Sequence, residues 1–121
     1  MSVNATPAIQ VTLTGPSLNS PSAPPLQSGG LPLYCPNGVD GQAATLPAST
    51  SGLALAFPVG VTAAVFIFIA ADTTTDLIVT VKGQALPVLP QGQGMILYGL
   101  TTSQISLASA LGGLIRYAVG G

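Results

Sequence analysis

Residues 63–83 read AAVFIFIAADTTTDLIVTVKG, and this stretch decides the fold. Residues 63–70 are apolar at every position, which is typical of a strand buried on both faces. Residues 77–82 form a second run rich in β-branched residues, and Gly83 ends it. Because the polar residues 72–76 lie between the two runs, the pattern predicts a hairpin closed by a turn of about four or five residues.

Further short runs continue this pattern toward the C-terminus. Residues 95–98, 103–108 and 114–119 each read as a strand, separated by glycine- and proline-rich connections. A short helical turn within residues 106–114 is the alternative at one place. Short strands at this spacing predict an all-β fold, either a small β-sandwich or a jelly-roll-like barrel.

The N-terminal part of the chain has a different composition. Ile9, Val11 and Leu13 alternate with polar residues, which predicts a half-buried strand or one donated to the sheet of a neighbouring molecule. Residues 15–52 are rich in proline, glycine and serine, which predicts a long extended arm with turns at Asn37–Gly38 and Asp40–Gly41. The expected division is an arm over residues 1–52 and a β core over residues 53–121.

Charged side chains are scarce along the whole chain. They make up 4% of the residues, against about 25% in an ordinary soluble domain. The ionisable side chains at neutral pH, apart from the cysteine and tyrosines, are Asp40, Asp72, Asp76, Lys82 and Arg116. Two cations cannot form the basic face of a nucleic-acid-binding protein, so we expect no nucleic-acid partner. The composition instead favours a subunit whose exterior is covered by neighbours, because charged residues are depleted at interface cores.

No group of residues predicts catalysis or a cofactor. The chain has no histidine, which excludes nucleophile systems that depend on one. A serine–lysine pair using Lys82 stays open, although a lysine ending a strand also discourages edge pairing. Asp72 and Asp76 could form a weak cation site, but aspartates flanking a turn are the simpler interpretation. Cys35 is expected to be a small packing residue. We therefore predict a protein that is not an enzyme and holds no metal or cofactor.

An alternative reading concerns residues 53–71, an uncharged run just long enough to cross a bilayer as a helix. Pro58 and Gly60 interrupt it, and no lysine or arginine cluster flanks it. Two strands separated at residues 58–60 explain it better, so a membrane anchor is the lesser possibility. The first residues lack a basic segment and an apolar segment, and we expect synthesis in a cytoplasm rather than secretion.

Six residues are candidates for contacts between subunits. Arg116, in the last predicted strand, could pair with Asp72 or Asp76 or reach across a subunit boundary. The candidates are Ile9, Val11, Leu13, Tyr34, Arg116 and Tyr117. A carbohydrate-binding sandwich would display more exposed aromatic residues than three tyrosines and three phenylalanines provide.

The C-terminal pattern resembles small virion proteins of tailed bacteriophages. The resemblance extends over roughly the last 60 residues and rests on the connector Leu89–Gly92, on residues 105–110 and on the closing run 115–121. It implies a β-sandwich or jelly-roll-like domain attached to a capsid or tail, commonly as a trimer, with the arm lying across neighbouring subunits. The expected function is that of a capsid decoration or cement subunit in the virion, bound to the major capsid protein or other virion proteins. A tail, fibre or spike component is the close alternative.

Overall fold

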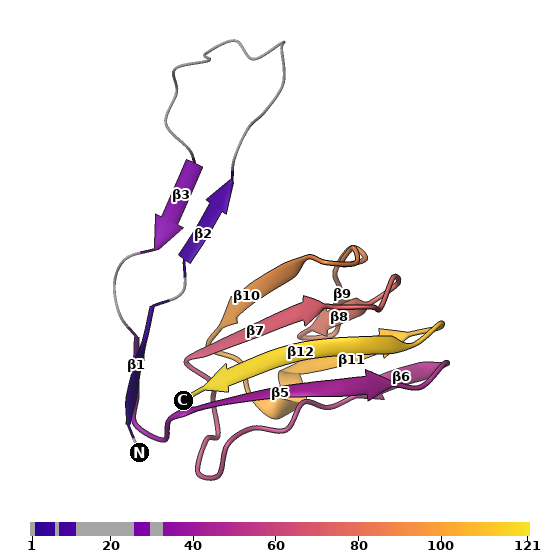
Figure 1. Cartoon of the computed structure of the whole chain (residues 1–121). Coiled ribbons are helices and arrows are strands. Elements are labelled where there is room, and N and C mark those ends of the chain that lie inside the picture. The colour runs from indigo at the N-terminus through magenta and orange to yellow at the C-terminus, as the bar shows by residue number, and fades with distance from the viewer. Residues whose placement is uncertain (1, 7, 12–25, 30–32) are drawn as a thin grey trace.

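The computed structural model describes residues 2–6, 8–11, 26–29 and 33–121 (Figure 1). This part of the chain is built of strands, with one short 3₁₀ helix and no α-helix. The strands of the N-terminal arm are β1 (Val3–Ala5), β2 (Ala8–Val11), β3 (Leu26–Gly29) and β4 (Leu33–Cys35). The elements that follow are β5 (Val39–Leu46), β6 (Thr50–Leu53), β7 (Phe66–Ala71), β8 (Ile78–Val81), β9 (Gln84–Ala85), β10 (Gly94–Tyr98), η1 (Thr102–Gln104), β11 (Ile105–Ser109) and β12 (Gly113–Gly120).

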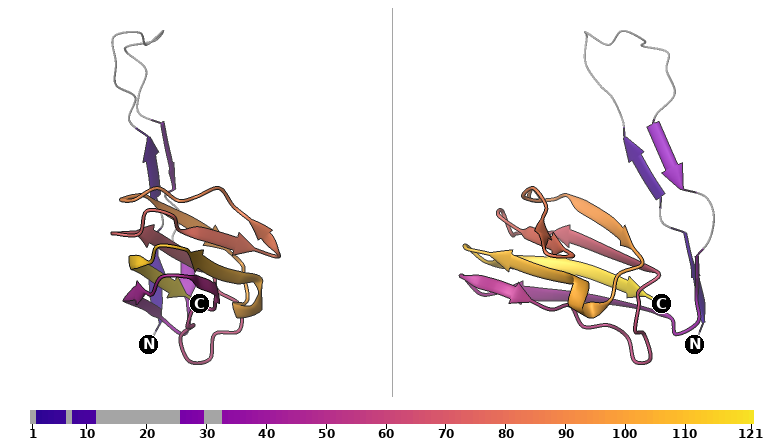
Figure 2. Two further views of the ribbon diagram at one scale, coloured as in Figure 1. Left: turned by 90° about the vertical axis from the view of Figure 1, so that its right-hand side faces the viewer. Right: turned by 180° about the vertical axis from the view of Figure 1, so that it is seen from behind.

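The strands after the arm form two four-stranded antiparallel sheets that pack face to face (Figures 1 and 2). One sheet has the order β10-β7-β12-β5 and the other the order β6-β11-β8-β9. The first strand pairs with the last, β5 with β12, and the pairs β6–β11, β7–β10 and β8–β9 are nested inside it. This nested order is that of one long hairpin rolled into two sheets, which is the jelly roll. The all-β prediction is confirmed.

The core lies between the two sheets and is made by every second residue of each strand. Ile67, Ile69 and Ala71 of β7 are completely buried, and Ile115 and Val119 of β12 lie opposite them on the same side of the sheet. The second sheet contributes fully buried residues such as Leu107 and Val79. Alternation of β-branched and leucine side chains therefore fills the space between the sheets, as expected for a sandwich.

The hairpin predicted between residues 63–70 and 77–82 is wrong, although both strands exist. β7 and β8 lie in different sheets, and the segment between them crosses over the end of β12. Threonines fix this crossing: Thr73 Oγ1 accepts the Leu114 amide at 2.7 Å, and the buried Thr74 hydroxyl donates to the Leu114 carbonyl at 3.1 Å. These side-chain bonds to β12 replace the ladder that a hairpin would form.

The sandwich begins earlier than the predicted boundary after residue 52. All eight residues of β5 pair with β12, and β6 pairs with β11, so both strands belong to the sandwich. Asp40 and Gly41 lie inside β5 and form no turn, whereas the turn predicted at Asn37–Gly38 is present. The sequence of β5 is rich in small residues, which hid a strand that pairing with β12 stabilises.

Two other expectations about local structure need correction. Residues 106–114 form no helical turn, because β11, a turn and β12 occupy them, and the 3₁₀ helix lies before them. In the stretch 53–71, Leu53 ends β6 and β7 begins at Phe66. The intervening residues form an irregular connection that buries Leu55 and Ala64 in the core.

Among the described residues, no helix is long and apolar enough to cross a membrane.

The arm leaves the sandwich as two short antiparallel pairs. β1 pairs with β4 next to the sandwich, and β2 pairs with β3 farther out, projecting away from both sheets (Figures 1 and 2). The predicted strand over residues 8–14 is seen as β2 over residues 8–11, and residues 12–14 lie outside the described residues.

Candidate interaction surface

The outer face of the β10-β7-β12-β5 sheet is composed mainly of apolar and small residues. Residues that pair across the strands point to the same face, so the register defines rows of outward side chains. The central row is Ile96, Phe68, Ala118 and Gly41. The rows on either side of it are Tyr98, Phe66, Gly120 and Val39, and Gly94, Ala70, Arg116 and Ala43.

Two phenylalanine rings lie over glycines on this face. A methyl group placed on Gly94 would meet the ring of Phe68 at 2.9 Å, and one placed on Gly120 would meet the ring of Phe66. The rings therefore lie close to the sheet and fill the space that the missing side chains leave. Phe68 remains 38% exposed and Tyr98 55% exposed. The middle of the face is thus aromatic and accessible.

The root of the arm covers one end of the same face. Cys35 of β4 is completely buried, and its Sγ lies 2.9 Å from the position a side chain on Gly120 would take. Ala5 and Thr6, at the end of β1, line a shallow depression together with Phe66 and Ile96. Burial raises the pKa of the Cys35 thiol, so this cysteine is the packing residue that the sequence predicted.

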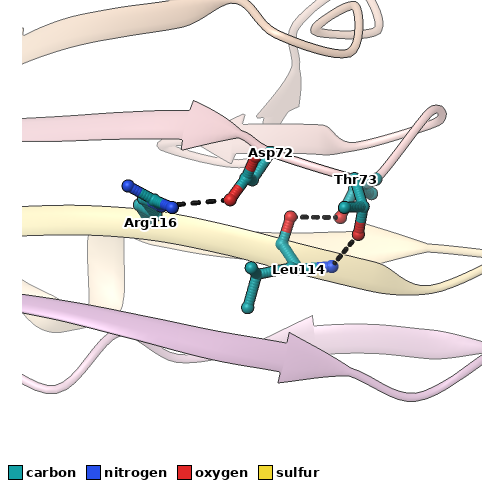
Figure 3. Close-up of polar contacts among 5 residues, drawn as sticks. Asp72, Thr73, Leu114 and Arg116 are labelled. Atoms are coloured by element: carbon teal, nitrogen blue, oxygen red, sulfur yellow. Dashed lines mark hydrogen bonds and ion pairs between the residues drawn. The ribbon is translucent and has the colours of Figure 1, made fainter.

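One ion pair lies at the other end of the face, as Figure 3 shows. The Nε of Arg116 donates to Oδ2 of Asp72 at 3.0 Å, and the Arg116 side chain is 68% exposed. Asp72 follows β7 directly and Arg116 lies in the neighbouring β12, which brings them together. A second shallow depression joins Arg116 to Phe68, Ala118 and Gly41. An exposed pair of this kind adds little to stability but leaves the face electrically neutral.

The opposite sheet presents a different outer face. Ser106 of β11 pairs with Thr80 of β8, so its two central strands place hydroxyl groups outward. The corresponding central strands of the other sheet place Phe68 and Ala118 outward. The neighbouring row of the same two strands, Ala108 and Ile78, is apolar, so this outer face is mixed. The β10-β7-β12-β5 face is the more apolar of the two and carries the aromatic side chains.

The predicted contact residues fall in different places. Arg116 lies on the apolar face, and its pairing with Asp72 confirms one of its two predicted carboxylate partners. Tyr34 is 62% exposed on β4. Ile9 and Val11 lie in β2, where only the backbone is described, and Leu13 lies outside the described residues.

Tyr117 is not a surface residue, contrary to the prediction. Its side chain points into the core and its hydroxyl donates to Gln42 Oε1 at 2.9 Å. Gln42 in turn donates to Asp40 at 2.8 Å. Burial, with a smaller contribution from the charge of Asp40, raises the pKa of Tyr117. The odd-numbered residues of β12 face the core. The sequence alone does not determine whether the odd- or the even-numbered residues of this strand face inward.

The acidic residues of the 72–76 segment have separate partners. Asp76 accepts the Ser109 hydroxyl at 2.5 Å and the amides of Ala110 and Leu111 at 2.9 and 3.1 Å. These bonds, led by the one from Ser109, lower the pKa of Asp76. Asp72 instead pairs with Arg116. Within the described ranges, no three histidine, cysteine, aspartate or glutamate residues are grouped as metal ligands.

Lys82 lies at the tip of the β8–β9 hairpin. Its φ of 51° and the φ of 80° at Gly83 give a two-residue turn between the paired residues Val81 and Gln84. The prediction that Lys82 ends a strand is therefore nearly right, since it directly follows β8.

Sequence reasoning missed the most exposed aromatic residues of the apolar face, Phe68 and Tyr98. The sequence of residues 63–70 predicts a strand buried on both sides. A strand whose outward side chains are apolar but exposed has the same sequence pattern as a strand buried on both faces. The available signal was that β7 and β10 contain no charged residue and β12 contains only Arg116.

Comparison of the chain with protein-family models, curated protein sequences and solved structures finds no match.

Proposed function

We propose that this chain is a non-enzymatic virion structural protein, most specifically a capsid decoration or cement subunit. It would stabilise a shell by packing against the major capsid protein and against copies of itself, with the arm reaching a neighbouring subunit. The observation that carries the proposal is the apolar outer face of the β10-β7-β12-β5 sheet. The jelly roll supports it, because this architecture recurs in viral capsid proteins, although it also occurs in lectins and other proteins.

The size of the face suits such a role. Four strands spaced about 4.8 Å apart, with five to eight residues at about 3.3 Å each, give a sheet of roughly 400 Å² in projection, and the arm root covers one end of it. An apolar patch of a few hundred Å² is comparable with the largest patch on a typical monomeric protein, and such a patch is often functional. Repetition over a lattice then adds many modest contacts into firm attachment.

A matched pair of variants tests the proposal. Ala118 lies at the centre of the apolar face and Ser106 at the centre of the opposite outer face, and both are half-buried on inner strands. Virus particles from the natural host of this sequence are purified, stripped of the protein and incubated with the wild type, Ala118→Lys or Ser106→Lys. Quantitative mass spectrometry measures the copies bound per particle.

We expect the native particles to contain the wild-type chain in a fixed ratio to the major capsid protein. Ala118→Lys should reduce rebinding at least tenfold, because a lysine ammonium would be buried against an apolar partner, whereas Ser106→Lys should rebind normally. Absence of the chain from native particles contradicts the proposal. Presence with tails rather than heads selects the tail, fibre or spike alternative.

A further inference from the structure

The outer edge of β5 is a long unpaired strand edge. β5 pairs with β12 on one side, and within residues 33–121 no backbone hydrogen bond joins its other side to another segment. Most of its residues are exposed, including Gly41, Ala43 and Thr45. An exposed row of amides and carbonyls of this kind is a template for another strand.

The backbone hydrogen bonds of β12 identify which residues of β5 face the open edge. The Leu114 and Gly120 carbonyls accept amides of the segments flanking β7, so the even-numbered residues of β12 point away from β5. Backbone groups alternate along a strand, and opposite residues of an antiparallel pair are either both bonded to each other or both not. Ala44, opposite Ile115, therefore bonds to β12, whereas Ala43, opposite Arg116, directs its N–H and C=O to the open edge.

The other three edges of the sandwich are less suitable for strand addition. β9 has two residues and β6 has four, with an irregular register against β11. β10 has five residues. β5 has eight residues in unbroken register and contains no proline, lysine or bulge, which are the usual means of blocking an edge. Its charged residue, Asp40, lies near its beginning.

The arm carries strands that need a further partner. β2 and β3 pair only with each other in the described part of the chain, and they project away from the sandwich (Figure 1). An isolated two-stranded ribbon is marginally stable in water, and a third strand stabilises it. One molecule thus has an unfilled acceptor edge at β5 and an unsupported donor ribbon at β2 and β3.

We infer that the open edge of β5 accepts strand β2 (Ala8–Val11) from the arm of a second copy of this chain. The inference rests on the proposed function in that it specifies how the arm joins neighbouring subunits. The added strand bonds to the groups of Gly41 and Ala43 that face the edge. Because donor and acceptor are different surfaces, each copy can donate to one neighbour and accept from another. The copies form a ring where the rotation between them closes, and a trimer is the expected size.

Two complementary variants of the full chain test this contact. Ala43→Pro removes an edge-facing N–H and keeps the small apolar character of the outer face, so it disables the acceptor. Ile9→Pro combined with Gln10→Pro removes the donors on both sides of β2, so it disables the arm. Ala44→Pro tests whether Ala43 faces the open edge and Ala44 faces β12. It removes a hydrogen bond to β12 and should therefore lower the melting temperature far more than Ala43→Pro does.

Light scattering coupled to size-exclusion chromatography measures the mass of each protein and of the mixture. We expect a homo-oligomer for the wild type and a monomer for each variant. An equimolar mixture should give a one-to-one complex, since one variant retains a donor and the other an acceptor. A monomeric wild type, an oligomeric Ala43→Pro, or a mixture that stays monomeric would overturn the inference. None of these results depends on particle binding, so the proposed function can fail or succeed independently.

Discussion

Asp76 holds the turn between β11 and β12 through three hydrogen bonds. Its carboxylate accepts the Ser109 hydroxyl and the amides of Ala110 and Leu111. These bonds favour the charged form, which lowers the pKa of Asp76 below its ordinary value of 3.8. The carboxylate therefore stabilises the fold above pH 3.8, and this contribution is lost as the pH falls through the lower pKa of the folded state.

Ser109→Ala removes the largest cause of this shift. We expect the pKa of Asp76 to rise toward 3.8, and the free energy of unfolding to depend less steeply on pH below that value. Carboxyl ¹³C chemical shifts followed through an acid titration measure the pKa directly. An unchanged pKa in Ser109→Ala would show that the backbone amides alone hold the carboxylate.

The ion pair between Arg116 and Asp72 is expected to contribute little to the stability of the single chain. Both side chains are accessible, so water and salt screen the attraction. Arg116→Gln should change the free energy of unfolding by less than about 1 kcal/mol. Urea unfolding of dilute, monomeric protein measures this, and a loss several times larger would mean that the pair organises the end of β12.

At the level of elements, the β8–β9 turn has a suboptimal residue. Lys82 adopts a left-handed backbone conformation that asparagine tolerates better, and Asn-Gly is the preferred sequence for this turn. Lys82→Asn should stabilise the protein by up to about 1 kcal/mol. Lys82→Gln, which removes the same charge without favouring the conformation, should give no gain in thermal unfolding. Equal gains in both would assign the effect to charge.

The packing of the arm root on the apolar face predicts a contrast between two glycines. A side chain on Gly120 would meet the Phe66 ring and lie 2.9 Å from Cys35 Sγ, whereas one on Gly41 would meet nothing within 4 Å. Gly120→Ala should destabilise the protein by about 1–3 kcal/mol. Gly41→Ala should leave the stability unchanged or raise it slightly. Chemical unfolding of both variants checks this, and similar effects would contradict the close approach of β4 to β12.

The strands β7, β8, β10, β11 and β12 could be predicted from the sequence, but their assignment to sheets could not. Runs such as residues 77–82 and 114–119 contain β-branched residues, which predict a strand without reference to the rest of the chain. Whether residues 72–76 turn back or cross to the other sheet depends on Thr73 and Thr74 bonding to Leu114, about forty positions along the chain. β5 was missed for a related reason, because its glycine and alanines become a strand through pairing with β12.

The same distinction applies to the candidate surface. Arg116 and its partner Asp72 could be proposed from charge scarcity alone, because few partners exist. The inward direction of Tyr117 and the outward direction of Phe68 depend on the register of β12 and β7, which a local pattern does not determine.

On the scale of the whole molecule, the two outer faces of the sandwich differ in composition. One sheet presents hydroxyl groups at Ser106 and Thr80, and the other presents Phe68, Ile96 and Tyr98 beside a single ion pair. Surface charge normally keeps protein molecules from associating, and this chain has only three acidic and two basic residues to do so. We therefore expect the apolar face to be covered when the protein performs its function.

Hydroxyl-radical footprinting of the free protein and of the assembled particle measures whether this face is covered. Tyr98 and Phe68 react readily when exposed, and they are 55% and 38% exposed in the single chain. We predict that both become strongly protected on assembly. If both react in the particle as they do in the free protein, the apolar face is not the assembly surface.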